Sequence, residues 1–361
     1  VKAINCGGDE ITIGAVTYEK DNSFTSGTPY SNVHPIAGNP LDQELYYTER
    51  WGTFYYTIDG LTEGNRYLVT LKLAEIYPYA YQGARIFTVV IDGKRVIMDL
   101  DLFVWAGGKY KAFDAKIPVQ AKGTSMKIAF FGEECCVNRA PKIEDNLPAD
   151  LYSLNRQHQP RYVPAKCRTA DAKVNAILVE DFEFNPQPFF AINSGSTESA
   201  ESQGIIYGAD NYFVLGQTYS TSEPISGTSD GKGKVYKTER YGDFSYAIPT
   251  GNGKFNVLLK FAEIYEYIYQ GARIIAVDIE GKRVITGLDL DAQFGLYQAY
   301  DFFVPFPIEV NDGVLNIDFF TEECCLTEQC RHHRHHPKAD QCESGHSKVS
   351  AILVYTQTDL Q

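Results

Sequence analysis

A long internal repeat is the feature that most constrains how this 361-residue chain can fold. Residues 71–96 and residues 259–284 are identical at 19 of 26 aligned positions, and the similarity continues outward in the same order. The two copies span residues 1–181 and 186–361. Because solenoid units are only about 20 to 50 residues long, a repeat of this length indicates a duplicated domain. We therefore predict two tandem domains, held as a fixed or semi-fixed pair by a short linker.

Each copy has the sequence pattern of an all-β domain. Four segments combine β-forming residues with polar residues at alternating positions: residues 67–73, 126–130, 255–261 and 315–319. Residues 85–98 fit a hairpin around Asp92-Gly93, a pair that tolerates the positive φ of a type I′ turn, and Glu280-Gly281 stands at the same place in the second copy. No long helical pattern with caps occurs. The sequence therefore predicts an all-β fold of two tandem jelly-roll β-sandwiches.

The charge of the chain and its lack of long apolar segments exclude two classes of partner. The net charge is -13, whereas nucleic acids and anionic membranes attract basic surfaces. No apolar run approaches the roughly 18 residues of a membrane span. We therefore expect no nucleic-acid partner and no direct insertion into a membrane. The chain begins with Val1 rather than Met, which fits either a processed product that has lost a signal peptide or a trimmed fragment.

The eight cysteines predict disulfides. Each copy contains four of them, namely Cys6, Cys135, Cys136 and Cys167 in the first and Cys324, Cys325, Cys330 and Cys342 in the second. Ser194 replaces Cys6 in the second copy and Cys330 has no counterpart in the first, yet both counts stay even. Adjacent cysteines seldom bridge each other. We therefore favour one member of each doublet paired with Cys167 or Cys342 and the other with Cys6 or Cys330, although four cysteines allow three connectivities. Disulfides favour an oxidising compartment: the extracellular space, the cell surface or the lumen of the endoplasmic reticulum.

A metal site is the alternative interpretation of the cysteine-rich end of the second copy. Residues 332–336 (HHRHH) and His346 add further soft ligands there. However, the spacing matches no common zinc pattern, and the first copy has no equivalent histidines. We therefore expect a solvated basic loop, with no metal and no other cofactor.

The sequence carries no recognisable catalytic motif. A nucleophile elbow, a phosphate-binding loop and a metalloprotease signature are all absent. The doublets Glu133-Glu134 and Glu322-Glu323 supply paired carboxylates, but adjacent residues on a strand point to opposite faces. Such a pair cannot flank one glycosidic bond as a hydrolase requires. We therefore expect that the protein is not an enzyme.

The motifs of both copies resemble those of malectin, a carbohydrate-binding lectin. The first copy contains the segments NCGG at residues 5–8, LYYTERWG at 45–52, LKLAEIY at 71–77 and DLDLF at 99–103, and residues 235–290 carry the corresponding series of the second copy. The resemblance covers most of both copies. It implies a jelly-roll lectin that binds glucose-containing oligosaccharides through aromatic side chains and one aspartate. Tandem malectin-like domains also form the ectodomains of a plant receptor-kinase family.

The resemblance also implies which residues form the sugar sites. In the first copy these are Tyr30, Trp51, Tyr77 and Asp171, with Tyr79 near enough to substitute for a family Phe that is Pro78 here. In the second copy they are Tyr219, Tyr241 and Tyr265, with Tyr267 as the substitute and Glu266 at the Phe position. Asp171 lies one residue out of register, and the second copy reads Ser344-Gly345-His346 at that position. We therefore expect a sugar site that is better preserved in the first domain.

Structural roles are the alternative for several of these residues. Trp51, Tyr77 and their counterparts can equally pack in a core or on a sheet face, whereas Tyr30 and Tyr219 lie in loops that favour binding. Salt bridges that clamp loops are the favoured role of four charged residues: Glu49, Arg50, Glu239 and Arg240. Glu75 and Glu263 end a strand and can cap a loop. Two functional hypotheses follow: a lectin for oligosaccharides or glycoproteins, or a protein-interaction and assembly module whose sugar sites have decayed.

Overall fold

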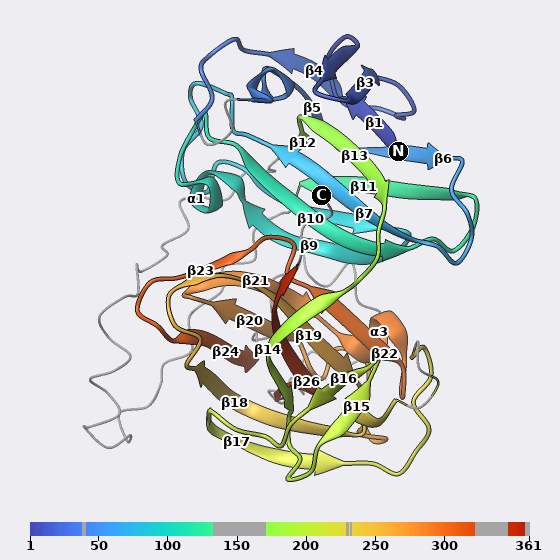
Figure 1. Ribbon diagram of the computed structural model, residues 1–361, viewed down its shortest axis with the longest axis vertical. Helices are drawn as coiled ribbons and strands as arrows, with labels where there is room; N and C mark the ends of the chain where they lie inside the picture. The colour runs from blue at the N-terminus through green and yellow to red at the C-terminus, as the bar shows by residue number, and fades with distance from the viewer. Residues whose placement is uncertain (38–40, 133–170, 229–230, 232, 322–345, 358–361) are drawn as a thin grey trace.

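The computed structural model describes residues 1–37, 41–132, 171–228, 231, 233–321 and 346–357, and its regular secondary structure is mostly β-strand. Two β-sandwiches are stacked along the long axis of the molecule, with the chain crossing from one to the other between β13 and β14 (Figure 1). The predicted all-β fold of two tandem sandwiches is confirmed. Three sheets contain the described strands of each half, and the two halves share none of them.

The first sandwich contains strands β1 to β13 and two short helical turns. Its elements are β1 (Lys2–Asn5), β2 (Ile11–Ile13), β3 (Val16–Lys20), β4 (Thr28–Ser31), η1 (Gln43–Tyr46), β5 (Thr48–Gly52), β6 (Phe54–Asp59), β7 (Arg66–Leu73), β8 (Ile86–Ile91), β9 (Lys94–Asp101), α1 (Leu102–Ala106), β10 (Phe113–Gln120), β11 (Ser125–Gly132), β12 (Ala172–Val174) and β13 (Ala176–Asp181). The strand orders are β10-β7-β13-β1-β3-β2, β6-β11-β8-β9 and β12-β5-β4.

The second sandwich repeats this plan. Its elements are β14 (Pro186–Asn193), β15 (Ala200–Ser202), β16 (Ile205–Tyr207), β17 (Phe213–Ser220), η2 (Lys234–Tyr236), β18 (Thr238–Ile248), β19 (Gly253–Ala262), β20 (Ile275–Ile279), β21 (Lys282–Leu288), α3 (Leu290–Phe294), β22 (Ala299–Phe303), β23 (Ile308–Val310), β24 (Leu315–Thr321), β25 (Ser347–Val349) and β26 (Ala351–Gln357). The strand orders are β14-β26-β19-β22, β15-β16 and β17-β18-β24-β20-β21, with β23 beside β19 and β25 beside β18.

The core and the hairpins follow from the repeated sequence. In the first sandwich the rings of Phe54 and Phe130 stack with their centroids 4.8 Å apart, and Phe244 and Phe319 repeat the stack at 4.7 Å in the second. Asp92-Gly93 and Glu280-Gly281 all have positive φ, so the two predicted type I′ turns are confirmed. The conserved pattern of core and turn residues thus produces the same sandwich twice.

An aromatic junction joins the two sandwiches. The buried ring of Phe306, from the second sandwich, packs between Trp105 and Phe113 of the first, with centroid separations of 4.1 and 5.1 Å. The Tyr300 hydroxyl donates a hydrogen bond to the main-chain carbonyl of Arg95 at 3.0 Å. One continuous core cluster therefore contains buried side chains from both halves.

Cys6 corrects one part of the disulfide prediction. It is the cysteine that falls within the described residues, and its thiol is free, fully buried and directed at the main-chain carbonyl of Ile4. Burial raises the pKa of this thiol well above its ordinary value, which keeps it protonated. Ser194 is equally buried at the equivalent position, so the site accommodates a small side chain rather than half of a bridge. The other seven cysteines lie outside the described residues.

Two carboxylates that face each other in the second sandwich give a testable pH dependence. Asp318 on β24 stands opposite Asp278 on β20, where the first sandwich has Ala129 opposite Val90. Burial, Asp278 and Glu280 together raise the pKa of Asp318 from 3.8 to about 6. The native state therefore disfavours the ionised carboxylate.

We expect Asp318→Asn to raise the free energy of unfolding at pH 7 by about 1 to 2 kcal/mol. Because the folded-state pKa lies above the unfolded value, the gain should be complete above pH 6 and vanish as the pH falls toward 4. Urea denaturation at pH 7 and pH 4 measures it. An equal effect at both pH values would show that the carboxylate charge is not the cause.

Candidate functional site

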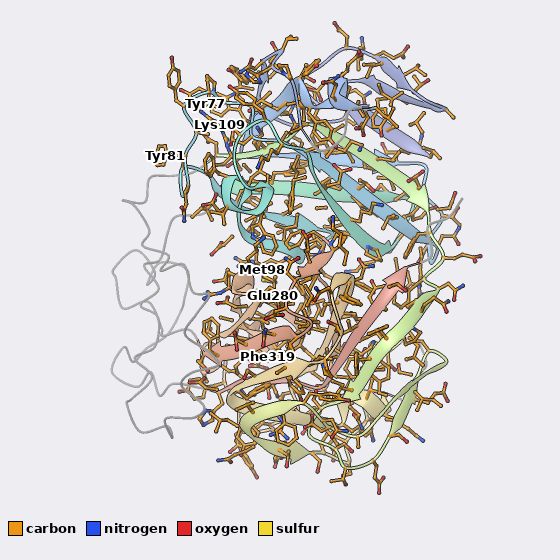
Figure 2. The ribbon with its side chains drawn as sticks, turned by 60° about the vertical axis from the view of Figure 1, so that its left-hand side comes forward. Tyr77, Tyr81, Met98, Lys109, Glu280 and Phe319 are labelled. Atoms are coloured by element: carbon orange, nitrogen blue, oxygen red, sulfur yellow. The ribbon has the colours of Figure 1, made fainter. Side chains whose placement is uncertain are left out.

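The loops that follow β7 and β19 hold the most exposed of the predicted tyrosines. Tyr77 and Tyr79 are 44% and 77% exposed, and Tyr265 and Tyr267 at the equivalent places are 39% and 74% exposed. Tyr77, Tyr81 and Lys109 lie together on one side of the first sandwich (Figure 2). Core packing therefore does not explain these rings, because isolated large aromatic side chains are normally buried.

The tyrosines form the same cluster in both sandwiches. In the first, the centroids of Tyr30 and Tyr77 are 6.2 Å apart and those of Tyr77 and Tyr79 are 5.6 Å apart, both edge to face. In the second, the Tyr219–Tyr265 and Tyr265–Tyr267 separations are 5.8 and 5.6 Å in the same geometry. Edge-to-face contact leaves ring faces turned in different directions, which suits them to contact a shaped ligand.

Trp51 and Tyr241 lie on the strands beside these clusters and are half-buried. Tyr30 on β4 stands opposite Glu49 on β5, and Trp51 comes two residues later, so strand alternation places the Trp51 and Tyr30 side chains on one face. In the second sandwich the Tyr241 hydroxyl donates a hydrogen bond to Gln217 Oε1 at 2.6 Å. The structure therefore brings the predicted strand residue to the same face as the tyrosine cluster.

A chain of buried charges supports the first cluster. Lys173 forms ion pairs with Glu49 and with Glu75 (Nζ–Oε1 3.5 Å), and Glu75 also pairs with Arg85 (Oε2–Nε 3.0 Å). Glu75 Oε1 accepts a hydrogen bond from the backbone N–H of Tyr77 at 2.9 Å. The predicted loop-capping role of Glu75 is thus confirmed, and the network fixes the backbone that carries the Tyr77 ring.

The second sandwich repeats this network. Lys348 pairs with Glu239 and with Glu263 (Nζ–Oε1 2.8 Å), and Arg273 pairs with Glu263 at 2.5 Å. The N–H of Tyr265 donates to Glu263 Oε1 at 3.0 Å. The structural roles predicted for Glu239 and Glu263 are confirmed.

The buried carboxylates have pKa values shifted in opposite directions. Burial raises the pKa of Glu49, although Lys173 opposes the shift. For Glu75, burial acts in the same way, but Lys173 and Arg85 together hold the pKa below its ordinary value. Glu75 is thus ionised at neutral pH and holds Lys173 and Arg85 by charge.

Three further residues singled out from the sequence also help to hold the loops. Arg50 pairs with Asp21 (Nη2–Oδ2 2.5 Å) and Arg240 with Asp210 (2.8 Å), so both arginines clamp loops as predicted. Asp171 is exposed, and its main-chain carbonyl accepts a hydrogen bond from Arg85 Nη1 at 2.9 Å. The structure therefore ties Asp171 to the charge network through its backbone.

Sequence reasoning missed Tyr110 and Tyr297, which border the two clusters. Both have positive φ, 57° and 56°, which is uncommon for a residue with a large side chain. The N–H of Tyr110 donates to the carbonyl of Glu75 at 2.9 Å, and that of Tyr297 donates to Glu263 at 2.8 Å. The repeat could have identified both tyrosines, because each lies two residues after a glycine, Gly108 or Gly295.

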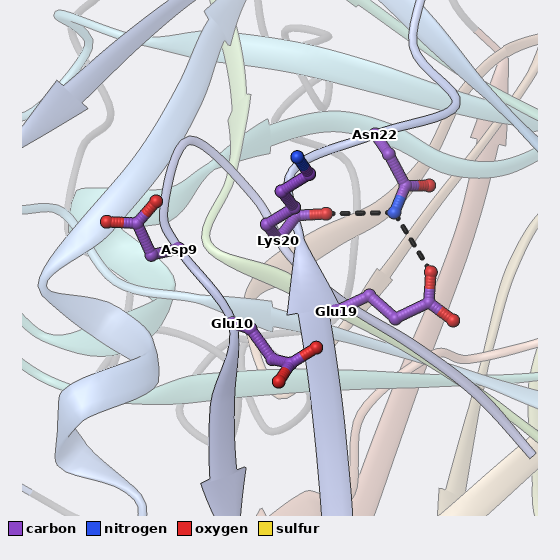
Figure 3. A pocket seen from close by; sticks show the side chains of 5 residues that line it. All are labelled: Asp9, Glu10, Glu19, Lys20 and Asn22. Carbon is purple, nitrogen blue, oxygen red and sulfur yellow. Dashed lines mark hydrogen bonds between the residues drawn. The ribbon is translucent and has the colours of Figure 1, made fainter.

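A separate polar hollow lies on the first sandwich and contains no aromatic residue. It is lined by Asp9, Glu10, Glu19, Lys20 and Asn22 (Figure 3). Asn22 Nδ2 donates hydrogen bonds to Glu19 Oε2 at 3.0 Å and to the carbonyl of Lys20 at 2.9 Å. Asn22 is therefore tied to two of the other lining residues.

The part of the chain that the structure describes shows neither a metal-binding group nor a membrane-spanning helix. There, no three or more His, Cys, Asp or Glu side chains are grouped closely enough to hold a metal ion. The run at residues 332–336 and the doublets Glu133-Glu134 and Glu322-Glu323 lie outside it. None of the described helices has the length and apolar character needed to span a bilayer.

Comparison with known proteins finds the same domain family in both halves of the chain. The sequence model of the malectin domain matches residues 1–148 and 189–339. Malectin-B of Xenopus laevis is 33% identical over 133 residues, which are 35% of this chain and 47% of the relative. Human malectin is 32% identical over 133 residues, which are 35% and 44% of the two chains. The match thus spans about half the length of these relatives.

The solved structures that match the chain include plant receptor ectodomains. The ANX1 ectodomain from Arabidopsis thaliana matches with 14% identity and a TM-score of 0.39, covering 99% of this chain and 96% of its own. The plant receptor-like kinase FER matches with 15% identity and a TM-score of 0.38, covering 99% and 96%. Since the malectin domain model matches most of both halves, the chain belongs to the malectin domain family and contains two such domains in tandem.

Proposed function

We propose that this chain is a non-enzymatic lectin that binds glucose-containing or related oligosaccharides through its exposed tyrosine clusters. The observation that carries the proposal is the duplication of one geometry: two tyrosines on a loop anchored by buried ion pairs, with a third tyrosine from a neighbouring strand in edge-to-face contact. Sugars present an apolar C–H face that packs on aromatic rings, and hydroxyls that bind nearby polar groups. The exposed rings of Tyr77 and Tyr265 offer such aromatic faces, which supports the proposal.

The carboxylates nearest the clusters favour binding over chemistry. Glu49 and Glu75 are almost fully buried and are neutralised by Lys173. A glycosidase needs two carboxyl groups facing the scissile bond, whereas these two hold the loop in place. Oligosaccharides and glycoproteins as ligands also fit the predicted location outside the cell, at its surface or in the lumen of the endoplasmic reticulum.

We expect Tyr77→Ala and Trp51→Ala each to weaken binding of glucose oligosaccharides by the full chain at least about fivefold. Each change removes an aromatic face while leaving the buried network intact, and one ring is worth about 1 to 3 kcal/mol. A glycan array followed by titration calorimetry on the strongest hit measures the effect. Each substitution is also made in a chain that carries Tyr265→Ala, so that binding by the second domain does not mask the loss in the first.

Tyr212→Ala is the matched control, because Tyr212 is 45% exposed and lies outside both clusters. It should bind like the unchanged chain. Equal weakening by Tyr212→Ala and Tyr77→Ala would mean that the clusters are not the binding sites.

A second candidate function, protein interaction or assembly, is favoured by the edge strand β17. Phe213, Val214 and Leu215 are all exposed there, and β17 pairs within its sheet with β18. The corresponding residues of the first domain include the polar Thr25 and Ser26. Exposed apolar side chains on an edge strand favour pairing with another chain. Absence of glycan binding by the unchanged chain would favour this function.

A further inference from the structure

The rims of the two tyrosine clusters correspond position by position. The N–H of Tyr110 meets the carbonyl of Glu75, and that of Tyr297 meets Glu263, so the two tyrosines are equivalent. Short parallel bridges join Ala37 to Lys111 and Ser226 to Gln298, which aligns the facing loops in the same way. Three pairs of rim positions follow from this alignment: His34 with Glu223, Pro78 with Glu266, and Lys109 with Leu296.

The rim of the first cluster carries basic side chains. The imidazole of His34 stacks on the Tyr110 ring with centroids 3.8 Å apart. The ammonium of Lys109 donates a hydrogen bond to the Pro78 carbonyl and lies 6.0 Å from the centroid of the Tyr110 ring. None of the three rim positions, His34, Pro78 and Lys109, is an acidic residue in the first domain.

The rim of the second cluster carries carboxylates at two of these three positions, Glu223 and Glu266. Glu266 accepts a hydrogen bond from the Tyr267 hydroxyl, which raises the pKa of that tyrosine. Burial, then Glu266 and Glu223, raise the pKa of Tyr297, so both carboxylates act on the same ring. Both glutamates are exposed, and the N–H of Glu223 is fixed to Thr221 Oγ1 at 3.1 Å. Glu266 follows Tyr265 directly, and Glu223 lies three residues before Ser226, which is bridged to Gln298 next to Tyr297. Acids therefore flank the second cluster on both of its loops.

We propose that the second domain selects an amino sugar, with Glu223 and Glu266 binding its ammonium group while Tyr265 and Tyr267 contact the ring. The inference rests on the proposed lectin function and assigns a ligand class to one of its two sites. An ammonium group is attracted both by carboxylates and by aromatic faces. A protonated glucosamine unit combines that charge with an apolar C–H face. The basic rim of the first domain disfavours the same ligand.

The test uses the full chain and three trisaccharides: glucosamine, glucose and galacturonic acid, titrated by calorimetry at pH 6 in low salt. We expect the glucosamine trisaccharide to bind at least tenfold more tightly than the glucose trisaccharide, with one site per chain. The advantage should fall in 0.5 M salt, because charge attraction between exposed groups is screened. A double variant, Glu223→Gln with Glu266→Gln, should lose the advantage while keeping its affinity for glucose.

The control is Glu183→Gln with Glu309→Gln, which alters net charge equally at exposed positions outside the cluster. It should keep the preference. A preference that survives in the Glu223/Glu266 variant, or equal binding of the glucosamine and glucose trisaccharides by the unchanged chain, would overturn the inference but leave the lectin function standing. If no trisaccharide binds and Tyr265→Ala changes nothing, the lectin function itself fails.

Discussion

Replacing Lys173 by methionine should destabilise the first domain by about 3 to 5 kcal/mol, because removing one partner of a buried ion pair leaves uncompensated charge in the interior. Lys173 is fully buried between Glu49 and Glu75, and methionine keeps the length of the side chain while removing its charge. Urea unfolding followed by circular dichroism gives the loss. Lys348→Met should act in the same way in the second domain.

The control and the pH dependence make this prediction specific. Lys20→Met, at an exposed position, should change the free energy of unfolding by less than about 0.5 kcal/mol. In the Lys173→Met variant, protonation of Glu49 and Glu75 removes the unpaired charge, so the loss should shrink as the pH falls. A loss below 1 kcal/mol at pH 7 would contradict a structural role for the network.

Phe306→Ala should destabilise the protein by about 3 to 5 kcal/mol, the usual cost of deleting a buried phenylalanine ring. The cavity would open between Trp105 and Phe113, at the junction of the two domains. We expect the single calorimetric transition to split into two, because the domains would no longer unfold together. Trp105 is one of two tryptophans in the chain, so its fluorescence should shift to the red as the junction hydrates.

Phe131→Ala provides the comparison, because Phe131 is an exposed phenylalanine of the first domain. Its removal should leave the transition single and the fluorescence unchanged. Should Phe306→Ala keep one transition at an unchanged temperature, the aromatic junction does not couple the domains.

The fold was predictable because its determinants are local and occur twice. Alternating strand patterns and the turns at Asp92-Gly93 and Glu280-Gly281 depend on a few neighbouring residues. The junction was not predictable, because Trp105 and Phe306 lie far apart in the sequence. Gln293 occupies the position of Trp105 in the second copy, and Val119 occupies the position of Phe306 in the first copy. Both aromatic residues therefore depart from the repeat. A departure toward a large aromatic residue is the signal that could have identified the contact.

The candidate site was predictable in its residues but not in its chemistry. The motifs located Tyr30, Tyr77 and their counterparts, which the structure brings into contact. The rim depends on loops that meet only in the folded chain, as at His34 and Tyr110. The even number of cysteines suggested a bridge at Cys6, but parity in a sequence carries no information about burial in a core.

The aromatic junction has a consequence for multivalent recognition. A packed connection of this kind keeps the two tyrosine clusters at one separation and one relative orientation. A branched glycan, or a surface that displays two sugar arms at that spacing, would engage the second cluster at a high effective concentration after the first had bound. Two sugar arms at any other spacing could not occupy both clusters of one chain at the same time. Binding would then depend on the distance between the sugars as well as on their identity. The contact between Phe306 and Trp105 would set that distance by fixing the separation of the two clusters.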